Sequence, residues 1–414
     1  MKKLILVALL FNTIAASAQT SNPSAYRKDF DYLWNTIDSN YCYFNKKPID
    51  CNKVKAIYAP RIDTVTTRNS FVTIIEQVLD ELYDHHISLG TNTDLSRRLV
   101  PTGADIWAEF QSDRAIVTEV RKGFGAEKVG ITAGMEVIAV NGVPINQASL
   151  PFLAHTDDIE AKNYALRLLL AGDHVTKRVI TLKNKDGVKE YYPDKDELML
   201  EHVKYPEMVE SKIIGDVGYI KVNNFLFDNS IIAKFDSVLN KLLHTKALII
   251  DMRETPSGGN TSVARAILGR FITAEHFYQK HEYYAEEKET GIKRSWEEIV
   301  SPRGITYTKP LVILANHWTG SIAEGITIGF DGMKRATVIG TTLARLNGSV
   351  ESYRMPNTKI GFNIPTERLY HVSGLPRELY KPTILVDVTK QKPGAGGDLI
   401  LNRALAFLKT KLNK

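Results

Sequence analysis

The stretch LVILANHWTGSIAE (residues 311–324) combines an apolar strand, a tight turn and the start of a helix. Residues 311–315 are all apolar, which is typical of a strand covered on both faces. A serine at such a strand-to-helix turn, here Ser321, can expose its hydroxyl while the amide of Ile322 points to where an oxyanion would form. Ser321 and Glu324 also fit a capping box, in which the hydroxyl only caps the helix. The sequence leaves both interpretations open.

A second stretch of the same kind is ALIIDMRETPSGGN (residues 247–260), in which a buried strand runs into a turn with two glycines and then a helix. Gly258 and Gly259 allow backbone amides to approach a ligand closely, and amides at a helix start favour negative charge. This pattern predicts half of an oxyanion hole. An ordinary strand-to-helix turn explains the same residues.

Strands and helices alternate around these two stretches. The predicted strands are residues 217–222, 247–251, 311–315 and 336–339, and the predicted helices are 231–243, 263–272 and one that opens near Ser321. Such alternation indicates βαβ units and a largely parallel sheet. Functional groups in these sheets collect where strands end and helices begin.

Residues 25–90 have a helical pattern, with apolar residues at spacings of three and four in two stripes: Phe30, Leu33, Trp34 and Ile37, then Phe71, Ile74, Ile75, Val78, Leu79 and Leu82. The second stripe ends just before His85 and His86. A serine hydroxyl needs a base, and histidine titrates in the right range. A packing or capping role at a helix end explains these histidines equally well. His317 is a rival base, although it lies on the preceding strand end and is expected to point elsewhere.

Residues 99–194 change to short strand-like runs, at 115–120, 136–140, 168–170 and 178–182, separated by turns. Asn141-Gly142 is a strong hairpin signal, and Asp186-Gly187 is a second turn. The segment predicts a compact, mostly β module with a helix or two.

A later segment, GLPRELYKPTILV (residues 374–386), contains a carboxylate in a loop that leads into an apolar strand. Glu378 could orient a catalytic base, as the third member of a triad does. Taken alone, the segment is also ordinary surface sequence.

The first residues have the features of a secretory signal peptide. Lys2 and Lys3 precede an apolar run at residues 4–11, and Ala16-Ser17-Ala18 resembles a cleavage site. The run is too short to span a bilayer, so we expect residues 1–18 to be removed and the protein to be periplasmic or extracellular, with an uncleaved anchor as the alternative. The net charge of +6 is spread without basic blocks, which gives no reason to expect nucleic acid.

Cys42 and Cys51 are the two cysteines of the chain. An exported protein can oxidise them to a disulfide, and two free thiols are equally compatible with the spacing. A zinc site would need further cysteine or histidine ligands nearby, which the segment lacks.

The ordered set of motifs resembles the carboxyl-terminal processing (tail-specific) serine peptidase family. The resemblance rests on the D-x-R turn before the glycine pair (residues 251–259), the S-x-x-E helix start at Ser321, and the P-x-I-x-V strand at residues 382–386. It implies an α/β fold, α+β overall, with a crotonase/ClpP-like catalytic core. It also implies an N-terminal helical subdomain (residues 19–95) and an inserted PDZ-like β module (residues 96–205) ahead of the catalytic domain (residues 206–414).

One branch of that family uses a Ser/Lys dyad, but the corresponding stretch here, residues 340–348, contains no lysine. Arg345 cannot replace it, because a guanidinium is never deprotonated in proteins. The chain is therefore closer to the tricorn-core-like branch, in which a histidine and a late glutamate serve the serine. That resemblance assigns the histidine to His86, within residues 84–87, and the glutamate to Glu378.

These assignments predict a secreted serine endopeptidase that hydrolyses polypeptides. Ser321 attacks the carbonyl, His86 transfers the proton and Glu378 orients the imidazole, while amides of Ile322 and of Gly258 or Gly259 stabilise the oxyanion. Ile322 stands where the family has alanine, which leaves the donor in place but crowds the pocket.

The PDZ-like module is expected to hold an extended segment or a free carboxyl terminus, with a carboxylate loop formed by Gly103, Ala104, Asp105 and Ile106. No metal or organic cofactor is implied. Two alternatives remain: a non-catalytic binding protein on the same fold, and a hydrolase of modified peptides or cell-wall fragments.

Overall fold

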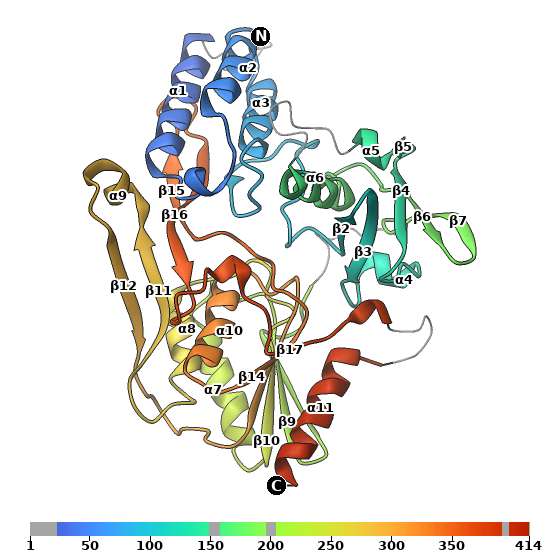
Figure 1. Ribbon diagram of the computed structural model, residues 1–414, viewed down its shortest axis with the longest axis vertical. Helices are drawn as coiled ribbons and strands as arrows, with labels where there is room; N and C mark the ends of the chain where they lie inside the picture. The colour runs from blue at the N-terminus through green and yellow to red at the C-terminus, as the bar shows by residue number, and fades with distance from the viewer. Residues whose placement is uncertain (1–22, 149–157, 196–203, 391–396, 414) are drawn as a thin grey trace, which may run out of the picture.

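A computed structural model of the 414-residue chain describes residues 23–148, 158–195, 204–390 and 397–413 (Figure 1). The predicted signal peptide lies outside these ranges. The described chain has helices at the amino-terminal end, a β module beside them, and a mixed α/β body that ends in the last helix.

The body contains a six-stranded sheet with the order β17-β14-β13-β10-β9-β8. Its neighbours are parallel except for the pair β8–β9, as the alternation of strands and helices predicted. The strands are β8 (Val209–Ile214), β9 (Val217–Val222), β10 (Ala247–Asp251), β13 (Leu311–Ala315), β14 (Thr337–Gly340) and β17 (Ile384–Leu385).

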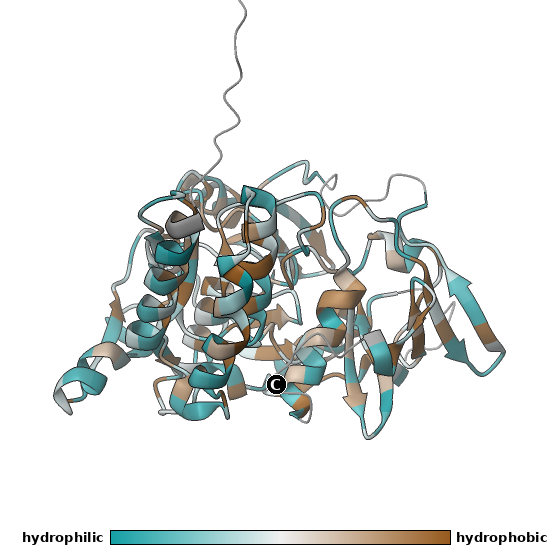
Figure 2. Cartoon of the chain, turned by 90° about the horizontal axis from the view of Figure 1, so that it is seen from above, coloured by the Kyte–Doolittle hydropathy of each residue, from teal (hydrophilic) through white to brown (hydrophobic). Residues whose placement is uncertain are grey.

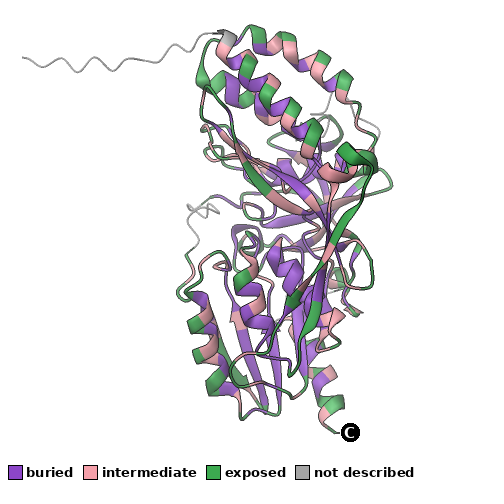
Figure 3. Ribbon diagram, turned by 90° about the vertical axis from the view of Figure 1, so that its left-hand side faces the viewer, coloured by how far each residue is buried: buried purple, intermediate pink, exposed green. Residues whose placement is uncertain are grey.

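Helices cover both faces of this sheet, so alternate residues of each central strand enter different cores. Ile250 and Ile313 pack with α7 (Ile231–Leu242), α8 (Thr261–Leu268) and α10 (Ile322–Gly332). Ile249 and Val312 face the other way, toward α11 (Leu399–Leu412). Figure 3 shows the central strands as buried. This explains why residues 247–251 and 311–315 are apolar at every position.

The amino-terminal helices are α1 (Pro23–Asn40), α2 (Cys51–Asp63) and α3 (Arg68–Asp80). They are amphipathic, with hydrophilic and hydrophobic residues on different sides (Figure 2). Phe30 and Phe71 share a core with Phe362 and Ile364, which come from a second sheet. Helices from the start of the chain thus pack on a strand from near its end.

That second sheet is antiparallel and has the order β1-β16-β11-β12, with β15 paired to β16. Its strands are β1 (Ser88–Leu89), β11 (His276–Tyr283), β12 (Arg294–Val300), β15 (Ser349–Arg354) and β16 (Gly361–Tyr370), and α9 (Tyr284–Thr290) connects β11 to β12. The sequence patterns had not indicated this sheet, because its strands β12 and β15 are mostly polar and partly exposed.

The β module has the antiparallel order β2-β3-β4-β6-β7, with β5 paired to β4. Its strands are β2 (Ile106–Gln111), β3 (Arg114–Val120), β4 (Glu136–Val140), β5 (Val143–Pro144), β6 (Ile180–Asn184) and β7 (Gly187–Tyr191), and its helices are α4 (Gly125–Lys128), α5 (Ile145–Ala148) and α6 (Ile159–Ala171). The predicted hairpin is confirmed, since Asn141 and Gly142 have φ values of 50° and 77° and join two paired strands.

Two local predictions were wrong. Residues 168–170 form part of helix α6 instead of a strand, because a short apolar run cannot distinguish a strand from a buried helix. The helix predicted over residues 263–272 ends at Leu268 and is followed by Gly269. Both cysteines are free thiols, with Cys42 buried. Across the described ranges, we find no helix long and apolar enough to cross a membrane.

We expect Arg178→Met to destabilise the β module by about 3–5 kcal/mol, because it removes the cation that is paired with two buried carboxylates. Arg178 is fully buried and lies 2.7 Å from both Asp105 and Asp194. Urea unfolding followed by tryptophan fluorescence measures the change. Arg114→Met removes an exposed pair with Glu136 in the same module and should leave the midpoint nearly unchanged. Equal midpoints for both variants would contradict this role of Arg178.

Candidate active site

The turn that carries Ser321 is fixed at the carboxyl end of β13. Asn316 accepts a hydrogen bond from the Trp318 amide at 2.9 Å, and the Thr319 hydroxyl donates to the Met252 carbonyl at 3.0 Å. Ser321 follows with a φ of 54°, which a residue other than glycine rarely adopts. Ordinary helix-capping serines have extended backbones, so this strained conformation favours a nucleophile turn over a simple cap.

The glycine-pair turn lies against this nucleophile turn. The Thr255 amide donates to the Trp318 carbonyl at 3.2 Å, and the Gly320 amide donates to the Thr255 carbonyl at 3.3 Å. A Cβ atom on Gly258 would lie 2.4 Å from the Cβ of Ser321, so only glycine fits there. The two turns that the sequence singled out therefore meet at one point.

The two glycines differ in what their amides can offer. The Gly258 amide donates to the Thr255 carbonyl at 3.3 Å. Within the part of the chain that the structure describes, the Gly259 amide donates to no other group. The Ile322 amide is the first of its helix, where no intrahelical acceptor exists. Gly259 and Ile322 are thus the two amides free to bind an oxyanion.

Glu324 holds the nucleophile turn from within helix α10. Its fully buried carboxylate accepts hydrogen bonds from the amides of Ser321 at 2.8 Å, Arg345 at 3.0 Å and Leu346 at 3.3 Å. Burial raises the pKa of Glu324 to about 7, against the opposing charge of Arg377 and the amide donors. The Glu324 arm of the predicted capping box is therefore present, and it also ties the Arg345–Leu346 segment to Ser321.

His86 enters the site from the turn after α3. Its Nδ1 lies 2.7 Å from the carbonyl oxygen of Asn347, and its amide donates to Asp84 at 3.0 Å. A carbonyl can only accept, so Nδ1 carries the proton and the lone pair of the neutral ring is on Nε2. Burial lowers the pKa of His86 to about 4, and the charge of Arg377 adds to this effect.

Arg377 connects His86 to Ser321 through the backbone. Its guanidinium donates to the carbonyls of Ser321 at 3.2 Å, Leu346 at 2.7 Å and Gly348 at 2.8 Å. His86 contacts Asn347, between the last two of these residues. Within the described ranges, the Ser321 hydroxyl has no hydrogen bond to an imidazole. His86 and, through Arg377, Ser321 are therefore both linked to residues 346–348, but in the described part of the chain they are not bonded to each other.

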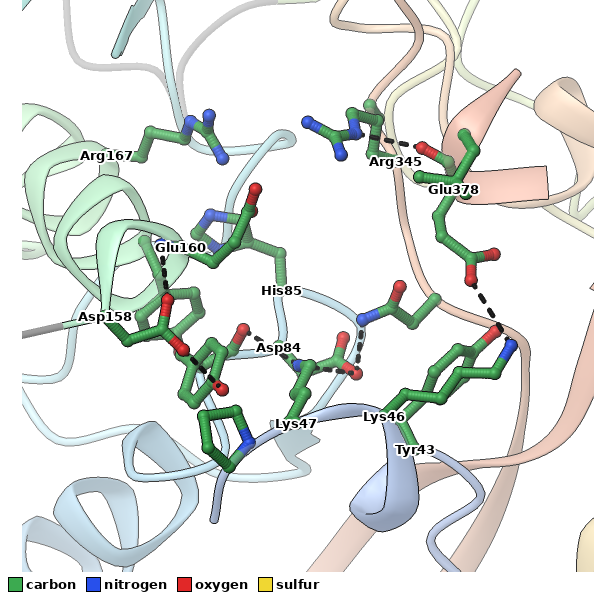
Figure 4. Close-up of a pocket in the computed structure, with 16 residues that line it drawn as sticks. Tyr43, Lys46, Lys47, Asp84, His85, Asp158, Glu160, Arg167, Arg345 and Glu378 are labelled. Carbon is green, nitrogen blue, oxygen red and sulfur yellow. Dashed lines mark hydrogen bonds and ion pairs between the residues drawn. The ribbon is translucent and has the colours of Figure 1, made fainter. Parts of the chain in front are cut away.

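Glu378 does not join His86. Its carboxylate lies 3.9 Å from Nζ of Lys46, and its carbonyl accepts a hydrogen bond from Nε of Arg345 at 2.9 Å. Both contacts are visible in Figure 4, at one wall of a pocket of about 280 Å³. His85 lines the same pocket and stacks on Tyr164 with ring centroids 4.3 Å apart. His85 thus has the packing role that the sequence allowed for a histidine at this helix end.

His317, the rival base, points away from Ser321 as expected. Its Nδ1 lies 2.5 Å from Glu119 of the β module, and its Nε2 lies 2.9 Å from the Thr342 hydroxyl. Burial alone would raise the pKa of Glu119, but the hydrogen bond and charge of His317 outweigh it and lower that pKa. His317 therefore fixes the β module on the catalytic body.

The predicted carboxylate loop at residues 103–106 is tightly bound within the protein. The amides of Gly103 and Ala104 donate to the carbonyls of Leu99 and Pro101, and Asp105 pairs with buried Arg178. The Ala104 carbonyl also accepts from Trp318 Nε1 at 2.7 Å. These bonds use the amides that a bound carboxylate would need.

Sequence reasoning missed Asn347, Asp84 and Arg377. Asn347 acts through its backbone carbonyl, and its side chain donates to Asp84 at 2.9 Å. No residue type signals a carbonyl acceptor. Arg377 lies beside Glu378 in the segment already under study, but only the fold reveals its three carbonyl partners. In the described ranges, no group of three or more acidic, histidine or cysteine side chains is arranged to hold a metal ion.

Comparisons with known proteins concern the family and the fold. Residues 216–386 match the model of peptidase family S41, and residues 23–80 match that of the tricorn protease C1 domain. The structure is similar to the photosystem II D1 C-terminal processing protease, with 15% identity and a TM-score of 0.56 over 88% of this chain and 93% of that one. It is also similar to mature CPAF, with 15% identity and a TM-score of 0.60 over 89% and 94% of the two chains. These structural likenesses establish the fold.

Replacing Glu324 by Gln should change how stability depends on pH. The folded-state pKa of Glu324 is raised, so the native protein loses stability relative to the variant as the pH rises from about 4.5 to about 7. The difference in unfolding free energy should change by up to about 3 kcal/mol over this window. Denaturant unfolding at several pH values measures it. Glu289→Gln on the exposed side of α9 is the control, and a flat difference for both variants would contradict the assignment.

Proposed function

Because the chain belongs to peptidase family S41 and is a serine peptidase that acts on proteins, we propose that Ser321 is its nucleophile and His86 its general base. The family match confirms the family that the sequence motifs suggested. The match of residues 23–80 to the tricorn protease C1 domain indicates that the chain is closer to the tricorn-like members of that family. The residue roles rest on the contacts of the site. They require that a polypeptide carbonyl sits between Ser321 and the two free amides.

The observation that carries this proposal is the bond from His86 to the Asn347 carbonyl. It leaves the lone pair on Nε2, as a base that accepts a serine proton needs. In a Ser-His-Asp triad a carboxylate holds the imidazole in this tautomer. In the proposed site the Asn347 carbonyl holds the imidazole in this tautomer. The resemblance to the family had assigned this role to Glu378. Asp84 holds Asn347 in turn.

In the proposed reaction, the Ser321 oxygen forms a bond to the peptide carbonyl carbon and its proton passes to His86 Nε2. The negative charge moves to the carbonyl oxygen, which accepts hydrogen bonds from the amides of Ile322 and Gly259. Each such donor typically contributes about 3 kcal/mol to the transition state. His86 then protonates the leaving amine, and water releases the acyl group by the reverse sequence.

The proposed substrates are extended polypeptide segments, and the proposed place of action lies outside the cytoplasm, after removal of residues 1–18. We assign residues 96–205 as a PDZ-like domain between a helical subdomain at 19–95 and the catalytic domain at 206–414. Strand β2 ends the order of its sheet and lies next to helix α6, which supports peptide addition along this edge.

A non-catalytic binding protein is the second candidate, and one observation favours it. The Ser321 hydroxyl has no hydrogen bond to an imidazole in the described part of the chain. Catalytic hydrogen bonds often form only when substrate binds, so an activity measurement decides between the two roles.

Cleavage of unfolded casein separates the two candidates. We expect Ser321→Ala to abolish cleavage and His86→Ala to lower kcat by about 100- to 10,000-fold, because the proton of the serine then has no acceptor. Glu378→Gln should have a much smaller effect, since its carboxylate contacts Lys46 and not His86. Equal cleavage by wild type and Ser321→Ala would indicate a contaminating peptidase and leave the binding role.

The pH dependence of kcat/KM should report the buried imidazole. We expect kcat/KM to fall as the pH is lowered through about 4, because a protonated His86 cannot accept the serine proton. A further step near pH 7 would belong to Glu324 and should be absent from the Glu324→Gln variant. An acidic limb near 6.5 that persists in this variant would exclude His86 in its buried environment as the base.

A further inference from the structure

Two arginines face each other across the pocket that His85 and Glu378 line. Arg167 comes from helix α6 of the β module, and Arg345 comes from the loop after β14 of the catalytic body. Figure 4 shows the terminal nitrogens of the two guanidinium groups pointing toward one another. Like charges in this arrangement repel, and the charge of Arg345 adds to burial in lowering the pKa of Arg167.

The Arg167 guanidinium is held in a fixed position. It lies 4.4 Å above the ring of Trp107 and donates to Glu109 at 2.8 Å. Only 6% of Arg167 is exposed, and its buried Nε has no hydrogen-bond partner. One wall of the pocket thus offers a preorganised cation with unused hydrogen-bonding capacity.

The Arg345 guanidinium is fixed by its inner nitrogen. Nε donates to the Glu378 carbonyl at 2.9 Å, which directs the two terminal nitrogens into the pocket. Among the residues that the structure describes, no carboxylate lies within 4.0 Å of this guanidinium. Among the described residues, Glu109 is therefore the one carboxylate in an ion pair with either guanidinium, so two cations share one paired anion. Glu160, on the same helix as Arg167, lines the pocket as well, and its charge partly opposes the lowering of the Arg167 pKa (Figure 4).

The arginine pair is coupled to the nucleophile by one carboxylate. The Arg345 amide donates to one oxygen of Glu324 at 3.0 Å, and the Ser321 amide donates to the other at 2.8 Å. A group bound between the guanidiniums is therefore held at a set distance from Ser321. Planar guanidinium forks match the geometry of a carboxylate.

We propose that Arg167 and Arg345 bind a carboxylate of the peptide substrate and thereby select the bond that Ser321 cleaves. The carboxylate comes either from an acidic side chain or from the free carboxyl terminus, because both present the same group to the arginine pair. This inference rests on the proposed function for its effect on cleavage, but the binding itself does not require catalysis.

The test uses otherwise neutral peptides in which a single Glu is moved along the chain. Each peptide has a Gln twin, and both are made with a free and with an amidated carboxyl terminus. For wild type we expect kcat/KM to be about 10-fold or more higher for the best carboxylate peptide than for its neutral twin, as for a charged hydrogen-bond pair. Preference for Glu over Gln identifies a side chain, and preference for the free over the amidated end identifies the terminus.

Arg345→Gln should reduce this ratio to about one, whatever its effect on the absolute rate for the neutral peptides. Arg345→Lys is the matched control, because it keeps the charge and the backbone conformation and should retain part of the preference. Unchanged thermal unfolding of both variants shows that the fold is intact. An equal ratio in wild type and Arg345→Gln, or no preference in wild type, would overturn the proposal.

Binding to the Ser321→Ala protein separates this inference from the peptidase assignment. Tryptophan fluorescence, with Trp107 directly under Arg167, gives the dissociation constants of the same peptides. Tighter binding of the carboxylate peptides that disappears in Ser321→Ala/Arg345→Gln supports the site even if no peptide is cleaved. Equal binding of each peptide and its neutral twin, or no binding at all, contradicts the site whatever the activity.

Discussion

The Glu324 carboxylate accepts hydrogen bonds from three backbone amides that belong to two separate turns. One is the strained turn at Ser321, and the other is the segment at Arg345 and Leu346. Burying a carboxylate costs free energy unless its oxygens accept hydrogen bonds. The buried Glu324 carboxylate therefore holds these two turns together. Arg377 completes the arrangement by donating to carbonyls on both sides. The proposed nucleophile, the segment that holds the proposed base, and Arg345 all depend on this point.

The β module is attached to the same region through buried polar contacts. Glu119 bonds with Asn316 and His317, which begin the nucleophile turn, and Arg121 donates to Glu254 in the glycine-pair turn. The module therefore contacts both turns that form the proposed oxyanion site. Arg167 in α6 belongs to this module as well, so the pocket between Arg167 and Arg345 has walls from two parts of the chain. The proposed catalytic serine and a proposed substrate-binding wall are consequently assembled by the same interface.

Much of the catalytic body could be predicted because its signals are local. The strands at residues 247–251 and 311–315 have the predicted bounds, since full burial on two faces requires apolar residues at every position. The hairpin at Asn141 was also predictable from a local signal, because its turn requires positive φ values. The antiparallel sheet that includes β11 and β16 was not, because its strands are paired across long sequence separations and carry mixed polar residues.

The sequence by itself determined the two central strands and the glycine at position 258, because burial on both faces and close approach of the backbone each restrict the residue type locally. Only the tertiary structure decided what holds His86. Its acceptor is the carbonyl of Asn347, 261 positions away, and every residue has such a carbonyl. For Arg345, the sequence was enough to exclude a role as a base, because a guanidinium stays protonated. Its place opposite Arg167 depends on how two modules pack, which no local pattern encodes.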